Sequence, residues 1–306
     1  MRPEKRANLA ASVHQRLLNI SRKTGVDPNH IWGRFAIERL LYRLACSDHA
    51  GEFVLKGAML FVAWTGKTYR PTYDLDLMGF GEGSAERVSS MFKKLCHLKV
   101  EPDGLVFDAE SVRLEPIRED QEYHGQRVTL NAFLGKARIP VQVDIGFGDV
   151  VTPKPEEIDF PTLLDFPCPR IRACPRETVV AEKLHAMTVL GMTNSRMKDF
   201  HDLYVLARDF PFDGATLAKG IKATFKRRKT DVPAGTPLAL AEEFERDAAK
   251  MVQWSAFVRR GGLGQEMPGL PDVLARLRAF LLPPIKTASG RGSAPGRWNA
   301  GGPWTA

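Results

Sequence analysis

The feature that most constrains the fold is a block of alternating apolar and polar residues in the middle of the chain. Period-two alternation is clear in QRVTLNAF, residues 126–133, and again in IPVQVDI, residues 139–145. Successive side chains of a β-strand point to opposite faces, so this pattern predicts strands with one apolar and one polar face. The preceding segment GLVFDAESVRLEPI, residues 104–117, is typical of a third strand. A β-sheet is therefore expected at the centre of the chain.

Apolar residues at helical spacing lie on both sides of this block. The expected helices cover residues 3–23, 29–46 and 83–98 before it, and 176–190, 195–208, 213–225, 237–259 and 271–281 after it. A proline-rich connector, residues 151–175, separates the sheet from the later helices. The fold class predicted is α+β, with a small mixed sheet and a mainly helical C-terminal half.

This pattern divides the chain into four expected parts. Residues 1–50 are N-terminal helices that pack on the core, and residues 51–152 form the core itself. Residues 153–284 form the helical C-terminal domain. Residues 285–306 are rich in Gly, Ser, Pro and Ala without periodicity, which predicts a disordered tail.

Two aspartates one residue apart lie in RPTYDLDLMGF, residues 70–80. In an extended segment Asp74 and Asp76 point to the same face, while Leu75 and Leu77 point to the other. Carboxylates that close repel each other unless a cation lies between them. The pair therefore indicates a divalent metal site, and the alternative is a solvated strand end where Asp is ordinary.

A third carboxylate, Asp144, lies in VQVDIGFGD, residues 141–149. Alternation places it on one face of its strand with Gln142 and Gly146. If this strand is a neighbour of the Asp74–Asp76 strand, three carboxylates converge on one side of the sheet. Such a set is suited to magnesium, which takes a few carboxylates and keeps positions for phosphate oxygens and water. The alternative for Asp144 is a turn at the end of a strand.

The net charge is +8, from 44 Lys and Arg against 36 Asp and Glu. Residues 194–230 hold nine Lys or Arg against four Asp and end in KRRK at 226–229. This excess permits an acidic partner such as nucleic acid or a nucleotide, although a solvated helix face is the commoner reason for such a run. The chain has no run of eighteen or more apolar residues, so no membrane span is predicted. Its four scattered cysteines fit a reduced cytoplasm.

Other residues are candidates for binding phosphates, although none is specific alone. Gly57 lies between an expected strand and an expected helix, where backbone N–H groups can face an anion. Lys183 lies within a predicted helix, where most lysines are solvated. Asp199 and Asp202 lie three residues apart on another, with Arg196 three residues before Asp199, a spacing typical of an Arg–Asp surface pair.

In their joint order, several segments resemble a known family. They are FVLKGAMLFVAW with RPTYDLDLMGF, EPIREDQEY, VQVDIGFGD, RETVVAEKLHAM and NSRMKDFHDLYVLAR. From about Arg39 to Arg260 the chain resembles the AbiEii/AbiGii toxin family of nucleotidyltransferases, which includes the MenT toxins of type IV toxin–antitoxin systems. The resemblance implies a polymerase-β-like nucleotidyltransferase core followed by a helical C-terminal domain.

The resemblance also implies roles for particular residues. The family's first motif maps onto Gly57, Asp74 and Asp76, with the two aspartates as metal ligands and catalytic residues. The lysine of its third motif maps onto Lys183. The aspartate of its fourth motif maps onto Asp199, with Asp202 as a close competitor and Arg196 as an additional candidate. Asp144 matches the family's strand aspartate and is the third candidate metal ligand.

The candidate nucleotide-binding residues are Lys56, Gly57, Ala58, Arg70, Thr72 and Lys183. The family's usual Gly-Ser pair is here Gly57-Ala58, which removes a hydroxyl that often contacts the triphosphate. Backbone amides or Lys56 would then take its place.

The implied activity is transfer of NMP from an NTP, with Mg²⁺ or Mn²⁺, to an RNA acceptor such as the 3′ end of tRNA. This would inhibit translation within a toxin–antitoxin or phage-defence system, beside a cognate antitoxin. Three alternatives stay open. They are nucleotidylation of a protein target, a non-catalytic module that binds RNA or nucleotide, and a basic DNA-binding regulator.

Overall fold

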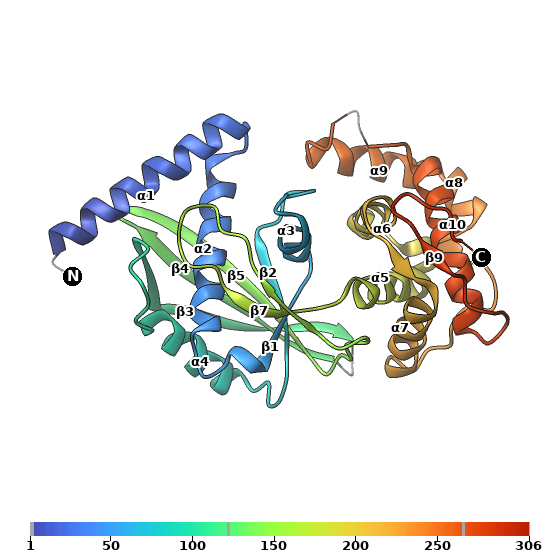
Figure 1. Cartoon of the computed structure of the whole chain (residues 1–306), viewed down its shortest axis with the longest axis horizontal. Coiled ribbons are helices and arrows are strands. Elements are labelled where there is room, and N and C mark those ends of the chain that lie inside the picture. The colour runs from blue at the N-terminus through green and yellow to red at the C-terminus, as the bar shows by residue number, and fades with distance from the viewer. Residues whose placement is uncertain (1–2, 121–122, 265–266, 306) are drawn as a thin grey trace. The chain divides into compact units, whose positions relative to one another are not determined.

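The computed structural model describes residues 3–120, 123–264 and 267–305 (Figure 1). Gln121 and Glu122 of the EPIREDQEY segment lie outside the described residues. The chain forms two compact units. The first comprises residues 1–148 and 156–173, and the second comprises residues 149–155 and 174–306.

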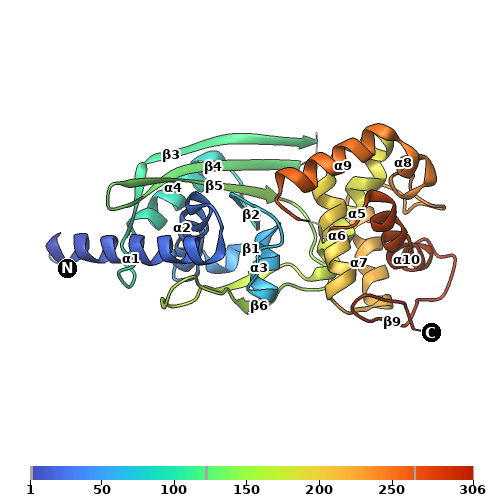
Figure 2. The same cartoon turned by 90° about the horizontal axis from the view of Figure 1, so that it is seen from above.

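The first unit is built on a seven-stranded mixed sheet in the order β3-β4-β5-β2-β1-β7-β6. Its strands are β1 (Phe53–Lys56), β2 (Asp74–Gly79), β3 (Leu105–Asp120), β4 (Tyr123–Leu134), β5 (Ala137–Phe147), β6 (Glu156–Asp159) and β7 (Arg170–Ala173). Figure 2 shows β3, β4 and β5 running side by side. Strands β2 and β5 are parallel, as are β1 and β7, whereas the other neighbours are antiparallel. The mixed sheet predicted from the sequence is thus present.

Helices cover one face of this sheet. They are α1 (Pro3–Thr24), α2 (Pro28–Ala45), the 3₁₀ turn η1 (Ala50–Glu52), α3 (Met59–Thr65) and α4 (Ala85–His97). The start of α2 follows from its sequence, since the Asp27 side chain accepts a hydrogen bond from Asn29 N at 2.7 Å and Pro28 fills the first turn. Helix α2 packs on β5 and β7, and α4 packs on β3.

The period-two pattern explains why one face of the sheet is apolar and the other polar. Val128 on β4 and Val143 on β5 are fully buried, and they form part of the apolar face on which the helices pack. The alternate residues on the same strands, Arg127 and Asp144, are only partly buried. The sheet therefore keeps a polar face as well as an apolar one.

The second unit is mainly helical. Its elements are α5 (Arg176–Leu190), η2 (Gly191–Thr193), α6 (Met197–Asp209), β8 (Phe212–Asp213), α7 (Gly214–Arg227), η3 (Leu238–Leu240), α8 (Glu242–Arg246), α9 (Ala248–Arg260), α10 (Leu270–Ala288) and β9 (Arg297–Trp298). Helix α7 packs on α5 and α10, and α6 packs on α10. Of the helices described, none is at once long enough and apolar enough to cross a membrane.

Two parts of the chain differ from the expected division. The proline-rich connector contains β6 and β7, which extend the sheet of the first unit, so residues 156–173 belong with that unit. The expected disordered tail is structured as well. Helix α10 continues to Ala288, and Trp298 is 1% exposed and donates a hydrogen bond from Nε1 to Ala207 O at 2.7 Å. Burial of one large aromatic ring provides the order that the surrounding Gly and Pro residues do not predict.

Candidate active site

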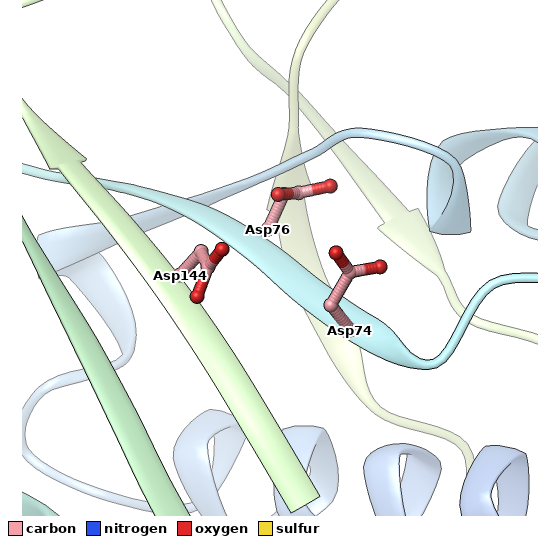
Figure 3. A group of neighbouring side chains, drawn as sticks. All are labelled: Asp74, Asp76 and Asp144. Carbon is pink, nitrogen blue, oxygen red and sulfur yellow. The ribbon is translucent and has the colours of Figure 1, made fainter. Parts of the chain in front are cut away.

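Three carboxylates of the first unit meet on the polar face of the sheet. Asp74 and Asp76 lie on β2, and Asp144 lies on the parallel neighbour β5, with Asp76 directly opposite Asp144. Each offers one oxygen such that the three atoms lie within 4.8 Å of one another (Figure 3). All three side chains are partly buried. The two strands are neighbours, which is the condition on which the three carboxylates were expected to converge.

The loop after β1 lies against this group. Gly57 has φ +68°, and a Cβ atom at this position would lie 1.7 Å from Asp76 Oδ2. The position is therefore restricted to glycine twice over, by its backbone conformation and by the close approach of the carboxylate. Lys56, the residue before, is paired with Asp76 in the β1–β2 register.

Asp144 has two partners on the same face. The Arg127 guanidinium on β4 donates from Nε to Oδ1 at 2.8 Å and from the Nη2 group to Oδ2 at 2.7 Å. The Gln142 amide donates to Oδ1 at 3.2 Å. The hydrogen bond to Asp144 raises the pKa of Arg127 above its usual value, and the charge of Asp74 contributes to this.

The other candidate nucleotide-binding residues of this unit lie beside β1 and β2. The Thr72 hydroxyl donates to Asp74 Oδ1 at 2.8 Å, which ties the residue to the acidic group. Arg70 is partly buried in the segment before β2. Ala58 is 7% exposed immediately before α3, where its methyl group is part of the core.

The second unit contains its own buried ionic cluster. Lys183 Nζ on α5 lies 2.8 Å from Asp199 Oδ1 and 2.9 Å from Asp202 Oδ2, both on α6. The two aspartate side chains are 1% and 2% exposed, and the lysine is 15% exposed. Arg196 Nε lies 2.8 Å from Asp199 Oδ2, close enough for an ion pair although not aligned for a hydrogen bond. His201 Nδ1 lies 3.1 Å from Asp202 Oδ1.

The structure decides between the alternatives left open for these residues. Lys183 is largely buried between two carboxylates rather than solvated. The Arg196–Asp199 pair is present, but its aspartate is buried while its arginine is half exposed. Because Lys183 contacts both aspartates at almost equal distance, the geometry does not choose between Asp199 and Asp202.

Two residues of these sites were not predicted from the sequence, namely Arg127 and His201. The alternation in QRVTLNAF does place Arg127 on the polar face of its strand. What it lacks is any sign that β4 and β5 pair with Arg127 opposite Asp144. That information lies in the sheet register, which a local pattern does not contain.

The donor set of the first unit suits a divalent cation. Three carboxylates from two adjacent strands are the oxygen ligands that magnesium prefers. Gly57 leaves room for the Asp76 carboxylate where any other side chain would displace it. Asp74, Asp76 and Asp144 are thus the residues that would hold a metal ion.

A mixed sheet with a cluster of carboxylates on its polar face, joined to a helical unit, is an architecture that fits nucleotidyl transfer. The family model described as nucleotidyl transferase AbiEii toxin, type IV TA system, matches residues 39–276. The chain therefore belongs to the AbiEii family and is a nucleotidyltransferase.

Among solved structures, the chain is similar to two from Helicobacter pylori. JHP933 is 15% identical with a TM-score of 0.46, over 83% of this chain and 88% of that one. A protein described as a nucleotidyltransferase is 15% identical with a TM-score of 0.48, over 87% of this chain and 99% of that one. No protein with a curated description matches the chain.

Proposed function

We propose that the protein transfers NMP from an NTP to an RNA acceptor, such as the 3′ end of tRNA, in a magnesium-dependent reaction that inhibits translation. The observation that carries the proposal is the convergence of Asp74, Asp76 and Asp144 on one face of the sheet. An RNA acceptor also agrees with the net charge of +8, since phosphates attract a basic protein.

In this proposal the acidic residues bind Mg²⁺ and the nucleotide together. A divalent ion held there would supply charge neutralisation and alignment for attack at the α-phosphate. Asp74 and Asp76 are fixed by the β2 backbone, and Asp74 is further held by Thr72. Gly57 lets the chain pass close to Asp76, so the Lys56 side chain and the backbone of Ala58 are proposed to contact the triphosphate. Arg70 is the remaining candidate contact to the nucleotide.

The cluster of the second unit has a complementary role in the proposal. Lys183 neutralises phosphate charge, for which a lysine point charge is sufficient. Its two ion pairs hold the ammonium in one place, so Asp199 and Asp202 act by positioning Lys183. Arg196, 48% exposed, is an additional contact for an acceptor phosphate.

The family also suggests a biological setting. A type IV toxin acts beside a cognate antitoxin, so the proposal includes a protein partner and a cytoplasmic site of action within a toxin–antitoxin or phage-defence system.

Transfer of label from α-³²P NTPs tests the proposal. Wild type, Asp76→Asn and the control Asp159→Asn are incubated with Mg²⁺, each NTP in turn, and bacterial tRNA with soluble protein. Asp159 is an exposed aspartate on β6 of the same sheet, so its variant changes the same charge away from the triad. We expect labelled RNA with wild type and Asp159→Asn, and a loss of at least about 100-fold with Asp76→Asn.

Other outcomes decide against the proposal. Label on a protein band would assign the enzyme to protein nucleotidylation instead. Absence of label with every NTP and acceptor, despite binding of nucleotide or RNA, would favour a non-catalytic binding module. Activity in Asp76→Asn equal to wild type would remove the acidic triad from the mechanism.

A further inference from the structure

Asp144 differs from Asp74 in how it is held. Both of its oxygens accept from the Arg127 guanidinium, at 2.8 and 2.7 Å, and Oδ1 also accepts from Gln142 at 3.2 Å. Asp74, by comparison, accepts from the neutral Thr72 hydroxyl at 2.8 Å. A bidentate Arg–carboxylate pair is among the strongest hydrogen-bonded arrangements in proteins and fixes the plane of the carboxylate.

The sheet register places this pair. Arg127 on β4 is directly opposite Asp144 on β5, which is directly opposite Asp76 on β2. The three residues thus lie in one row across three adjacent strands, and Arg127 is separated from Asp76 by a single strand. Backbone hydrogen bonds between the strands hold all three residues, so the Arg127 side chain extends from a strand rather than from a loop.

The charge of Arg127 bears directly on a metal ion at the triad. Three carboxylates carry a charge of −3, and the Arg127 guanidinium offsets one of these charges at Asp144. The same two Asp144 oxygens that bind Arg127 are the ligand atoms available to a cation, so guanidinium and cation compete for them. Coulomb repulsion between Arg127 and a divalent ion adds to this competition.

We propose that Arg127 is a positioning residue that holds Asp144 and lowers the affinity of the triad for a divalent ion in the absence of nucleotide. Metal binding then depends on the negative charge that a triphosphate brings. This inference rests on the proposed nucleotidyl transfer for its purpose, but the effect on metal affinity is measured without nucleotide or acceptor.

Binding of Mn²⁺ to the full chain, followed by electron paramagnetic resonance, tests the inference. Arg127→Gln removes the charge and the bidentate contact. The matched control is Arg138→Gln, an exposed arginine on β5 that donates to Asn131 at 2.9 Å. It lies six residues from Asp144 on the same strand, or about 20 Å along it. We expect Arg127→Gln to bind Mn²⁺ about 3- to 10-fold more tightly than wild type, and Arg138→Gln to bind as wild type does.

An Asp144→Asn background shows whether the effect passes through Asp144. There we expect Arg127→Gln to alter Mn²⁺ affinity less than in the wild-type background, because asparagine keeps only one of the two shared oxygens and carries no charge. In transfer assays Arg127→Gln lowers kcat while reducing the metal concentration needed for half-saturation. A purely structural role of Arg127 would not lower kcat and tighten metal binding at the same time.

The inference is overturned if Arg127→Gln binds Mn²⁺ no more tightly than Arg138→Gln does. A cooperative thermal unfolding transition must first show that the Arg127→Gln protein is folded. Weaker binding would also overturn it, since Arg127 would then hold Asp144 ready for the metal. Failure of wild type and all variants to bind Mn²⁺ would overturn both this inference and the metal site. Tighter Mn²⁺ binding by Arg127→Gln, together with no nucleotidyl transfer by wild type, would contradict the proposed function alone.

Discussion

At the scale of single residues, the contact between Gly57 and Asp76 offers the sharpest test of the acidic site. In Gly57→Ala the added Cβ would lie 1.7 Å from Asp76 Oδ2, so the carboxylate must move. A displacement of about 1 Å in a reacting group costs on the order of 100-fold in rate. We expect Gly57→Ala to lose nucleotidyl transfer by about this factor, measured as label transfer from α-³²P NTP.

Gly66→Ala is the matched control for this change. Gly66 has φ +70°, almost the same backbone conformation as Gly57, but a Cβ there meets no atom within 4 Å. Both variants therefore carry similar backbone strain, about 1 kcal/mol, which chemical denaturation measures. An equal loss of nucleotidyl transfer in the two variants would show that backbone strain, rather than contact with Asp76, causes the loss.

The same residues show what the sequence could and could not predict. Period-two alternation assigned Asp74 and Asp76 to one face and Asp144 to one face of its own strand, and the three were grouped only on the condition that the two strands are neighbours, which they are. Arg127 was missed because its importance depends on which strand pairs with which, and at what register. The partners of Lys183 depend on the packing of α5 against α6, which is equally invisible to local spacing.

At the scale of elements, α7 carries a basic surface that could contact the proposed RNA acceptor. Lys219, Lys222 and Lys226 are exposed and recur at i, i+3 and i+7, so they lie along one side of the helix. The helix contains no acidic residue, and within the described ranges no ion pair neutralises these three lysines. A row of unneutralised charges of this kind is suited to phosphates of a nucleic acid backbone.

Replacement of all three α7 lysines by glutamine is expected to weaken RNA binding at low salt by at least about 10-fold. The slope of log affinity against log salt should fall by about 2 to 3, since each phosphate contact contributes roughly 0.7 to 0.9. Fluorescence anisotropy with labelled tRNA measures both. The control replaces Lys93, Lys94 and Lys99 by glutamine, three exposed lysines around an open hollow at the end of α4. Its net charge therefore equals that of the α7 triple variant. Equal losses in both triple variants would contradict a specific role for α7.

Elements with strong local patterns were predicted well. Strands β3, β4 and β5 and the main helices follow from alternation and helical spacing. The short strands β6 and β7 were missed within the proline-rich connector, because four residues carry little periodicity and pair with distant partners. The tail was misjudged for a similar reason, since Trp298 is ordered by contact with Phe280, 5.0 Å away between ring centroids.

At the scale of the whole molecule, a buried ionic network ties distant parts of the first unit together. Glu38 on α2 is fully buried and accepts a hydrogen bond from Leu163 N at 2.8 Å. Arg39 donates to Asp103 at 3.1 Å and to Pro167 O at 2.8 Å. The network therefore joins α2 to the segment between β6 and β7. Burial of charged groups costs free energy, so the free energy of unfolding depends on whether these groups are ionised.

The free energy of unfolding is therefore expected to depend on pH through Glu38. Burial raises the pKa of Glu38 from 4.5 to about 7, although the Leu163 N–H and Arg39 oppose the rise. A carboxyl whose pKa is higher in the folded state contributes stability fully below the unfolded pKa, and loses it as pH rises through the folded value. Wild type should therefore lose about 3 kcal/mol relative to Glu38→Gln between about pH 4.5 and about pH 8. Urea denaturation of both proteins at each pH measures this difference.

Glu52→Gln is the control of opposite sign. Hydrogen bonds from His49 and then Arg87 hold the pKa of Glu52 below its usual value. Its contribution to stability is present above the unfolded pKa and is lost as pH falls, so the Glu52→Gln difference should be largest at neutral pH and shrink on acidification. If the Glu38→Gln difference instead followed the same direction as Glu52→Gln, Glu38 would be ionised in the folded protein, and Arg39 rather than burial would control its state.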